Sequence, residues 1–312
     1  MPKVSICILC HNAEDTIARA ITSAASQDYK NTEIIVVDDA STDNSLRELA
    51  KLAQEYNIKL VKNQTNEGRG SSRNKAVHSA TGEFIVFFDD DDVSTPQRIT
   101  TQLRTILSFE KKMKTDKIAC YASAERRYPN GYNLFTHAIG STDAVPPHGS
   151  DMAKYLLSFY RHKSWYYGAG TPTSALMIRK SLVISAGGFD ANLRYVEDVD
   201  LAIRLSLNGC YFIGSPIKLL VRNMSESADK SSRNNFCAER KLAIKYKKFL
   251  KEHRIFHHAY HWPELRFYHF QRKYHMFFLK LVILMIYNPL ITIRHLLSTG
   301  PNRIKHELKI KM

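Results

Sequence analysis

The nine residues from Phe84 to Asp92 read Phe-Ile-Val-Phe-Phe-Asp-Asp-Asp-Asp, an apolar run followed without a gap by four carboxylates. A continuous apolar run of this length is typical of a strand buried on both faces. Successive side chains of an extended chain point to opposite sides, so we expect Asp89 and Asp91 on one side. Asp90 and Asp92 are then expected on the other. Adjacent like charges need a countercharge to stay ionised together.

Two interpretations of this acidic run are open. Carboxylate oxygens are the hard ligands that Mg²⁺ and Mn²⁺ prefer, and these ions keep open positions for substrate phosphates. The alternative is a solvated acidic loop that caps the next helix through Thr95 and Pro96. The metal site is favoured because the run ends a strand in an alternating α/β pattern, where ligands bind in open sheets.

Strand-like and helix-like segments alternate through the first part of the chain. Strands are expected at Val4–Leu9, Glu33–Val37, Lys59–Lys62 and Phe84–Phe88, with a helix after each of the first three. Short connections between such units predict parallel strands joined by right-handed crossovers. The expected fold class is therefore α/β, with a mostly parallel, Rossmann-like sheet flanked by helices.

The second part of the chain is less regular. A strand is expected at Ile118–Ala124, a hairpin turn at Asn130-Gly131, and a helix from about Tyr195. Two short strands are expected at Tyr211–Ile213 and Lys218–Val221. Beyond these the pattern becomes helical and basic.

The charge of the chain is uneven. Its 312 residues carry a formal charge of +15, and residues 251–312 hold 11 Lys and Arg against 3 Asp and Glu, with 8 of the 13 His. This balance indicates an anionic partner: nucleic acid, a phosphorylated ligand or a membrane surface. We expect a catalytic domain over residues 1–225 and a basic, membrane-associating helical tail over residues 226–312.

Other polar groups follow predicted strands or open predicted helices. Asp38 and Asp39 could accept hydrogen bonds from a base or ribose, although a helix N-cap is the more frequent role. Gly68, Arg69 and Arg73 could hold a diphosphate through charge-assisted contacts, or could form only a surface turn. The glycine pattern is neither G-x-G-x-x-G nor a P-loop.

Glu197 and Asp198 stand at the start of the helix expected near Tyr195. The helix dipole favours acids there whatever their function, so the local pattern alone favours that interpretation. The functional alternative is a general base, because a carboxylate beside an acceptor hydroxyl can remove its proton during attack.

Taken together, these motifs resemble glycosyltransferase family 2, an inverting family with the GT-A fold. The resemblance covers roughly residues 3 to 225, and five elements in family-like order carry it. They are Val4–Asn12, Ile35–Asp43, Asn66–Asn74, the Asp-x-Asp motif within Phe87–Asp92, and Gly187–Asp190 leading to Glu197–Arg204.

The resemblance implies a role for each motif. Asp91, with Asp89, would hold the Mn²⁺ or Mg²⁺ that bridges the donor phosphates. Asp198 would be the general base, with Glu197 as the alternative. The implied donor-binding residues are His11, Asn12, Asp38, Asp39, Gly68, Arg69, Arg73, Asp89 and Asp90.

Two departures from the family pattern bear on these roles, and one absent motif bears on how many sugars are transferred. His11 stands where the family often has Tyr, so stacking on the base would be by imidazole. Met224 stands where the family often has a metal-binding His, and a thioether is a poor ligand for a hard cation. The Gln-x-x-Arg-Trp motif of processive synthases is absent from the sequence, which favours transfer of a single sugar.

The expected function is therefore inverting transfer of one sugar from a nucleotide diphosphate sugar, with UDP expected, to a glycan or lipid-linked hydroxyl during bacterial surface polysaccharide synthesis. One alternative is a sugar-nucleotide nucleotidyltransferase, although the glycine-rich basic loop that such enzymes need after the first strand is absent. Another is a basic nucleic-acid-binding or membrane-binding protein, although no nucleic-acid recognition motif is visible. We expect no nucleic-acid partner.

The tail suggests a membrane surface as partner. Met276 to Tyr287 is apolar except for Lys280, and it is shorter than the roughly 20 residues that span a bilayer. Arg272, Lys273 and Lys280 recur on one side of a helix, with Phe277, Phe278, Leu281, Leu284 and Met285 elsewhere. This predicts a helix in an anionic membrane interface, with packing on the domain or a homodimer interface as the alternative. An odd number of Cys and no signal-peptide pattern favour a cytoplasmic protein at the inner face of the membrane.

Overall fold

The computed structural model describes residues 1–142, 145–224 and 232–311. They divide into two compact units. The first contains residues 1–127, 133–149 and 164–224, and the second contains residues 128–132, 150–163 and the described tail from 232 onwards.

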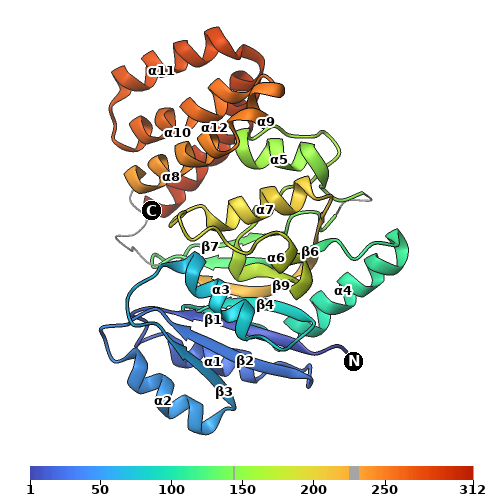
Figure 1. Cartoon of the computed structure of the whole chain (residues 1–312). Helices are drawn as coiled ribbons and strands as arrows, with labels where there is room; N and C mark the ends of the chain where they lie inside the picture. Colours follow the sequence, from blue (N-terminus) through green and yellow to red (C-terminus); the bar gives the residue numbers. More distant parts are fainter. Residues whose placement is uncertain (143–144, 225–231, 312) are drawn as a thin grey trace. The chain divides into compact units, whose positions relative to one another are not determined.

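A nine-stranded sheet forms the centre of the first unit, counted over its described residues (Figure 1). The strands are β1 (Val4–Cys10), β2 (Thr32–Asp38), β3 (Ile58–Lys62), β4 (Phe84–Asp89), β5 (Asp92–Ser94), β6 (Ile118–Arg127), β7 (Asn133–Thr136), β8 (Leu176–Arg179) and β9 (Tyr211–Asn223). Their order is β3-β2-β1-β4-β8-β6-β9-β5, and β7 pairs with β6. The α/β fold class is confirmed.

Parallel pairing holds where the sequence predicts it. The strands β3, β2, β1 and β4 are parallel neighbours. The apolar runs of β1, β2 and β4 are buried on both faces, whereas the residues of β3 are half-buried or exposed. Beyond β4 the sheet is mixed, because β8 runs antiparallel to both β4 and β6, whereas β6 and β9 are parallel. The sheet is thus parallel in its first half and mixed in its second.

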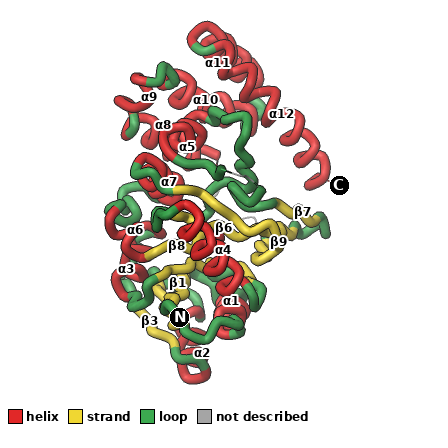
Figure 2. Tube along the Cα trace, turned by 90° about the vertical axis from the view of Figure 1, so that its right-hand side faces the viewer, coloured by secondary structure: helices red, strands yellow, loops and turns green. Residues whose placement is uncertain are grey.

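Helices cover both faces of this sheet. The core on one face joins alternate residues of the central strands to α1 (Ile17–Ala25), α2 (Ser45–Glu55) and α4 (Arg98–Met113). On the other face α3 (Arg69–Ser79) contacts β1 and β2, and Phe87 of β4 meets Phe189 edge-on at 5.6 Å. The short α6 (Lys180–Ser185) lies on the same side of the strands as α3, opposite α1 (Figure 2).

The segment Tyr211–Asn223 is one long strand rather than the two short strands that the sequence predicts. Gly214, Ser215 and Pro216 interrupt the apolar pattern there. The pairing of β6 with β9 shifts register near this interruption, between Tyr121 and Ser123. A bulge of this kind tolerates a proline that a regular central strand would not.

The second unit is helical. Its helices are α5 (Gly149–Ser158), α8 (Ser232–Lys245), α9 (Lys247–Glu252), α10 (Phe256–Phe270), α11 (Tyr274–Tyr287) and α12 (Pro289–Lys311). Leu157 of α5 packs against Ala243, Leu250 and Ile255 in the core of this unit. The unit therefore takes in residues 150–163, which the sequence assigned to the first domain, because packing and not chain order joins them. The expected boundary at 225–226 lies outside the described residues.

The surface of α11 differs from the sequence prediction. Lys280 is half-buried and its Nζ lies 2.9 Å from Glu264, so it does not extend towards solvent. Leu284 is fully buried. The exposed apolar face of this unit consists of Phe278, Leu279, Val282, Ile286 and Tyr287 of α11 with Leu290, Ile293 and Leu297 of α12. Among the described helices, none combines the length and the apolar character needed to cross a membrane.

Candidate active site

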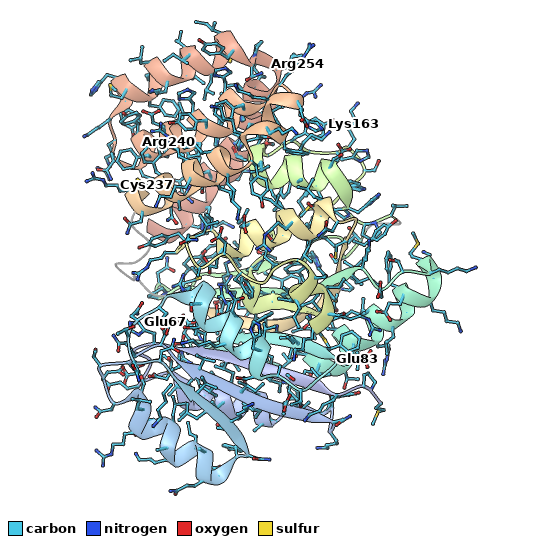
Figure 3. All side chains as sticks on the ribbon, in the orientation of Figure 1. Glu67, Glu83, Lys163, Cys237, Arg240 and Arg254 are labelled. Atoms are coloured by element: carbon cyan, nitrogen blue, oxygen red, sulfur yellow. The ribbon has the colours of Figure 1, made fainter. Side chains whose placement is uncertain are left out.

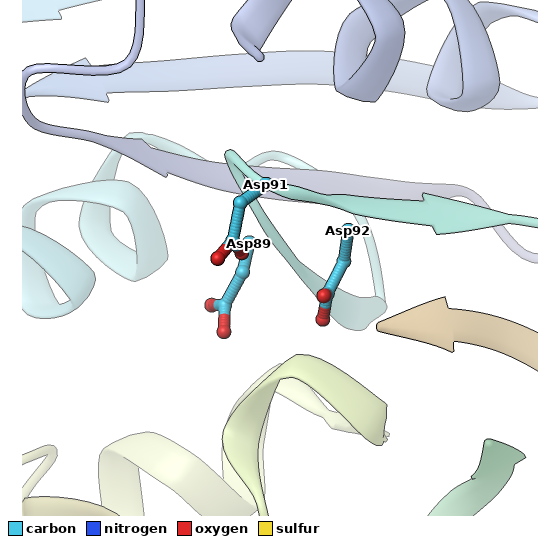
Figure 4. A group of neighbouring side chains, drawn as sticks. All are labelled: Asp89, Asp91 and Asp92. Carbon is cyan, nitrogen blue, oxygen red and sulfur yellow. The ribbon is translucent and has the colours of Figure 1, made fainter. Parts of the chain in front are cut away.

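Asp90 and Asp91 form a turn between β4 and β5. The turn brings together Asp89, Asp91 and Asp92, and one carboxylate oxygen of each lies within 4.8 Å of the others. Figure 4 shows these three side chains pointing to the same side of the chain. The prediction that Asp92 lies on the opposite side from Asp89 and Asp91 is wrong, because the turn ends the extended backbone on which that alternation depends.

Asp90 is the aspartate that points elsewhere. Its Oδ2 accepts a hydrogen bond from the backbone N–H of His11, at 3.0 Å. Burial, together with the charges of Asp89 and Asp91, raises the pKa of Asp90 to about 7 although this hydrogen bond opposes the shift. Asp90 therefore links the acidic turn to the loop after β1.

Strand β9 forms a second wall beside the turn. It pairs antiparallel with β5, with Asp92 opposite Arg222. Nε of Arg222 lies 3.4 Å from Oδ2 of Asp92, and Nδ2 of Asn223 donates to the carbonyl of Asp91 at 3.3 Å. The residues of β9 that contact the turn are thus Arg222 and Asn223. The N–H of Met224 donates to the carbonyl of Arg127 instead.

A buried arginine that the sequence analysis missed lies next to the acidic turn. The guanidinium of Arg98 donates to the hydroxyl of Ser94 at 2.9 Å and to the carbonyls of Phe87 and Ser174 at 3.0 and 2.7 Å. Burial lowers the pKa of Arg98 to about 9, against the raising effect of Asp92 and Asp89. The available signal was the spacing of Arg98 and Gln102, two polar residues on the buried face of α4.

The two aspartates at the end of β2 differ in how many hydrogen bonds they accept from the protein. The carboxylate of Asp39 accepts hydrogen bonds from Nδ2 of Asn63 and from the N–H groups of Glu67 and Gly68, all at 2.8–2.9 Å. Asp38 is fully buried, and its Oδ1 has no hydrogen-bond partner among the described residues. Asp39 therefore holds the turn before α3, and Asp38 is the carboxylate with capacity left for another group.

The turn after β1 is joined to the turn after β2. Nδ1 of His11 lies 2.9 Å from the carbonyl of Asp39, and Nε2 lies 3.2 Å from Nδ2 of Asn66. These contacts fit a ring that donates from Nδ1 and accepts at Nε2. The side-chain oxygen of Asn12 accepts from the N–H of Thr42 at 2.8 Å. His11 and Asn12 thus lie beside the two aspartates with which the sequence groups them.

The start of α3 separates residues that the sequence placed in one diphosphate site. Gly68 has φ of +85°, a conformation that favours glycine, and Arg69 is exposed. Arg73 is buried, with Nη1 2.6 Å from Oε1 of Glu197 and Nη2 3.6 Å from Oδ1 of Asp89. Arg73 therefore connects the acidic turn to the start of α7 (Glu197–Leu207), and its geometry does not favour a direct diphosphate contact.

The same geometry distinguishes the two candidates for the general base. Glu197 is buried and paired with Arg73. Asp198 is half-buried, and its Oδ1 accepts a local hydrogen bond from the backbone N–H of Val199 at 2.8 Å. Burial, then the charge of Glu197, raises the pKa of Asp198 to about 6, with Arg73 opposing. A carboxylate whose pKa lies just below neutral pH is ionised at that pH and is still basic enough to take a proton. Asp198 therefore fits the role of general base better than Glu197.

Asn74 joins two of the sequence motifs directly. Its Nδ2 donates to the carbonyl of Phe189 at 2.8 Å, and its Oδ1 accepts from the N–H of the same residue at 2.7 Å. Gly188 has φ of +69°, and a Cβ there would lie 2.6 Å from Oδ1 of Asn74. The second glycine of the Gly-Gly-Phe-Asp motif is therefore required by both its conformation and this close approach.

The acidic turn fits a divalent cation. Three carboxylates converge, and oxygen ligands are those that Mg²⁺ and Mn²⁺ take in proteins. Arg73 lies 3.6 Å from Asp89 and Arg222 lies 3.4 Å from Asp92, so positive charge borders this group of carboxylates. Asp92, which the sequence analysis did not assign to the metal, lies close enough to be a third ligand.

Residues 5–182 match the family described as glycosyl transferase family 2. The chain belongs to this family. Its relatives include EpsE of Bacillus subtilis, with 31% identity over 75% of this chain and 77% of EpsE. Escherichia coli WfaP, a UDP-Glc:alpha-D-GlcNAc-diphosphoundecaprenol beta-1,3-glucosyltransferase, is 37% identical over 38% of this chain and 44% of its own length.

Solved structures show the same fold for this family 2 glycosyltransferase. Staphylococcus aureus TarS 1-349 in complex with UDP-GlcNAc superposes with a TM-score of 0.60 and 22% identity, covering 86% of this chain and 73% of TarS. The GT-A fold predicted from the sequence is thus confirmed, and the nucleotidyltransferase alternative is set aside. The protein is a glycosyltransferase.

Proposed function

We propose that this glycosyltransferase moves one sugar from a UDP-sugar to a hydroxyl of a glycan or lipid-linked acceptor during cell-surface polysaccharide synthesis. The observation that carries the proposal is the link between an acidic turn and a candidate base through Arg73, which contacts both Asp89 and Glu197. The names of WfaP and TarS, and the UDP-GlcNAc bound in a TarS structure, support a UDP-sugar donor. The absent processive-synthase motif supports transfer of a single sugar.

In the proposed reaction the acceptor oxygen attacks the anomeric carbon from the face opposite the nucleotide. The bond between that carbon and the diphosphate oxygen breaks, so the configuration inverts and UDP leaves. The carboxylate of Asp198 takes the hydroxyl proton as the new bond forms. Glu197 and Arg73 hold the start of α7 so that Asp198 stays in position.

The proposed cofactor is Mn²⁺ or Mg²⁺, held by Asp91 and Asp89 with Asp92 as a third ligand. When bound, such an ion supplies positive charge that stabilises the departing diphosphate. Without a bound ion, the positive charges of Arg98 and Arg222 offset the repulsion among the carboxylates of the turn and so help to keep them close together.

A panel of nucleotide sugars tests the donor assignment. The purified protein is incubated with several UDP-, GDP- and TDP-sugars, with Mn²⁺, with Mg²⁺ or with chelator, and released nucleotide is measured. We expect release from one or a few UDP-sugars, and only when a divalent ion is present. Release from a non-UDP sugar alone, or full release with chelator, would contradict the donor or the metal assignment respectively.

We further propose that the helical unit lies on an anionic membrane through its exposed apolar face, at the inner side of the cell membrane. Isolated apolar residues on a surface are ordinary, but eight exposed apolar side chains on two successive helices are typical of an interaction site. Residues 232–311 carry 17 Lys and Arg against 4 Asp and Glu. A second copy would bring the same positive charge to the interface, whereas an anionic bilayer is complementary.

A matched pair of variants tests this face. Val282→Ser with Ile286→Ser removes two side chains that are 56% and 72% exposed. We expect the partition onto phosphatidylglycerol vesicles to fall about tenfold or more, because each buried apolar side chain contributes about 1.5–3 kcal/mol. The control Ile184→Ser with Leu207→Ser changes two exposed apolar residues of the first unit. Equal losses in both variants, or a wild-type dimer that dissociates in the first variant without vesicle binding, would contradict the membrane assignment.

A further inference from the structure

A pocket of about 400 Å³ opens in the helical unit, where α9 gives way to α10 beside the junction of α11 and α12. It is lined by Lys251, Arg254, Phe256, His257, Tyr287 and Asn288. Arg254, labelled in Figure 3, belongs to the corner between α9 and α10. None of these lining residues is acidic, two are cations, and the proposed reaction uses none of them.

The corner that carries Arg254 is fixed by its backbone. Arg254 has φ of +57°, and its N–H donates to the carbonyl of Lys251 at 3.0 Å. The N–H of Ile255 donates to the carbonyl of Leu250 at 2.9 Å. The carbonyl of Arg254 accepts from Nδ2 of Asn288 at 3.1 Å, which ties this corner to the one between α11 and α12. Both sides of the pocket are therefore held together.

The two cations of the pocket are available to a ligand. Lys251 and Arg254 are exposed, and their side chains make no hydrogen bond or ion pair with the residues that the structure describes. Glu252 lies between them in sequence but does not line the pocket. An ammonium and a guanidinium at one opening favour an anion, and phosphate offers both the charge and the oxygens that they bind.

The remaining walls suit an organic, hydroxyl-bearing group. His257 and Tyr287 stack with ring centroids 4.4 Å apart and an interplanar angle of 10°. Oδ1 of Asn288 is buried and has no partner among the described residues. A buried acceptor without a donor is unfavourable, and a ligand hydroxyl would satisfy it once a small shift of the Asn288 side chain uncovers this oxygen. Inorganic phosphate alone would not contact the stacked rings and would not donate to Oδ1 of Asn288.

We propose that this pocket binds the phosphorylated, hydroxyl-bearing head group of an anionic lipid. Tyr287 lines the pocket and also belongs to the exposed apolar face, so a head group in the pocket would have its acyl chains beside apolar side chains. The inference rests on the membrane association proposed above and is independent of the catalytic assignment. Free glycerol phosphate offers the same chemistry, so the experiment has a lipid arm and a soluble arm.

The lipid arm compares two variants of the full chain that remove equal charge. Lys251→Gln with Arg254→Gln empties the pocket of cations, whereas Arg233→Gln with Lys241→Gln removes two exposed cations of α8. Partition onto vesicles of phosphatidylcholine and phosphatidylglycerol is measured by sedimentation. We expect the pocket variant to lose about tenfold or more and the α8 variant no more than about threefold, because contact with a head group adds to the general surface attraction.

The soluble arm uses sn-glycerol 1-phosphate, with inorganic phosphate beside it, and follows binding by calorimetry and by the imidazole resonances of His257. Binding of glycerol phosphate that the pocket variant abolishes supports the pocket, and in the absence of vesicle binding it assigns the ligand to a soluble source. Equal losses by the two variants on vesicles, with no glycerol phosphate binding, overturn the proposal. So does a wild-type protein that binds neither probe.

Circular dichroism and nucleotide release from a UDP-sugar are recorded for every variant. A folded pocket variant with normal nucleotide release and weakened vesicle binding supports the head-group site. A wild-type protein that binds vesicles but releases no nucleotide leaves the head-group site supported and counts against the donor assignment alone. The two proposals can thus fail separately.

Discussion

The acidic turn of the first unit and the basic pocket of the second place charge in opposite ways. Around the turn, Asp90 accepts a backbone N–H, Asp92 faces Arg222, and Asp89 faces the buried Arg73. In the pocket, Lys251 and Arg254 are exposed and their side chains lack protein partners among the described residues. Buried, interconnected charges fix a geometry, and exposed ones attract a partner without fixing it.

This difference predicts how the two regions respond to substitution. Removing one member of the turn should have a large effect, because the others were positioned by it. Removing exposed cations should have a smaller effect that salt can mimic.

The largest expected effect is that of Asp91→Ala. We expect nucleotide release to fall by about 10³-fold or more, because the diphosphate would lose the charge that stabilises its departure. The measurement is UDP release with saturating Mn²⁺. The control is Asp116→Ala, which removes an exposed carboxylate outside the turn. A fully active Asp91→Ala enzyme would overturn the metal assignment.

Asp198→Asn comes next. We expect sugar transfer to fall by about 10²-fold to 10⁴-fold, the range for loss of a general base, while calorimetry shows unchanged binding of the UDP-sugar. Weakened donor binding in this variant would assign Asp198 to the donor site instead. Glu197→Asp should not show this pattern of lost transfer with normal donor binding. It shortens the side chain that pairs with Arg73 and leaves the carboxylate of Asp198 in place.

Glu197→Gln tests the buried pair as a structural element. It leaves the guanidinium of Arg73 with less compensating charge, and we expect the free energy of unfolding in urea to fall by about 3 kcal/mol. The exposed pair of Lys51 and Glu48 provides the comparison, and Glu48→Gln should cost about 0–1 kcal/mol. Equal losses of unfolding free energy in the two variants would show that burial does not increase the contribution of the Arg73–Glu197 pair to stability.

The pH profile gives a smaller effect. The folded protein raises the pKa of Asp198 from 3.8 to about 6. The base acts only when deprotonated, so kcat/KM should rise as pH increases through about 6 and should be about tenfold lower near pH 5 than near pH 7. The residual activity of Asp198→Asn should lack this limb. A limb near pH 4 would show that the base is a different or less buried carboxylate.

The smallest expected effect is that of salt, which should weaken vesicle binding more than nucleotide release. Raising ionic strength from about 0.05 to about 0.5 M shortens the screening length several-fold and should weaken vesicle binding. Release of nucleotide from a UDP-sugar in solution should change by less than about twofold, because the charges around the turn are buried or half-buried and lie within a few ångströms of one another. Parallel loss of both activities would remove the distinction between the regions.

The strands that the sequence predicted best are those buried on both faces. Continuous apolar runs such as Phe84–Phe88 are stable only when they are buried on both faces, which favours a central strand. The strands β1, β2 and β4 therefore appear within a residue or two of their expected positions. The three-residue strand β5 was missed because Asp92 opens it, and an acidic residue gives no strand signal. Its existence depends on pairing with β9, a contact distant in sequence.

In the candidate site, too, features set by nearby residues were predicted, and features set by residues distant in sequence were missed. The grouping of Asp89 with Asp91 and the placement of His11 beside Asp39 followed from local motifs. The burial of Arg73 against Glu197 could not be read from a stretch that looks like a surface turn, because its partner lies 124 residues later. The ion pair that half-buries Lys280 was likewise missed, because its partner Glu264 belongs to another helix.

The pairing of β5 with β9 also sets an order of events during synthesis. The family match ends at residue 182, by which point all four aspartates of the turn have been made. Arg222 and Asn223, which contact the turn, come about forty residues later. A ribosome-bound chain that stops at the end of the family match would have every candidate metal ligand but would lack the strand that holds two of them. The site therefore matures late, after most of the sheet can already have formed.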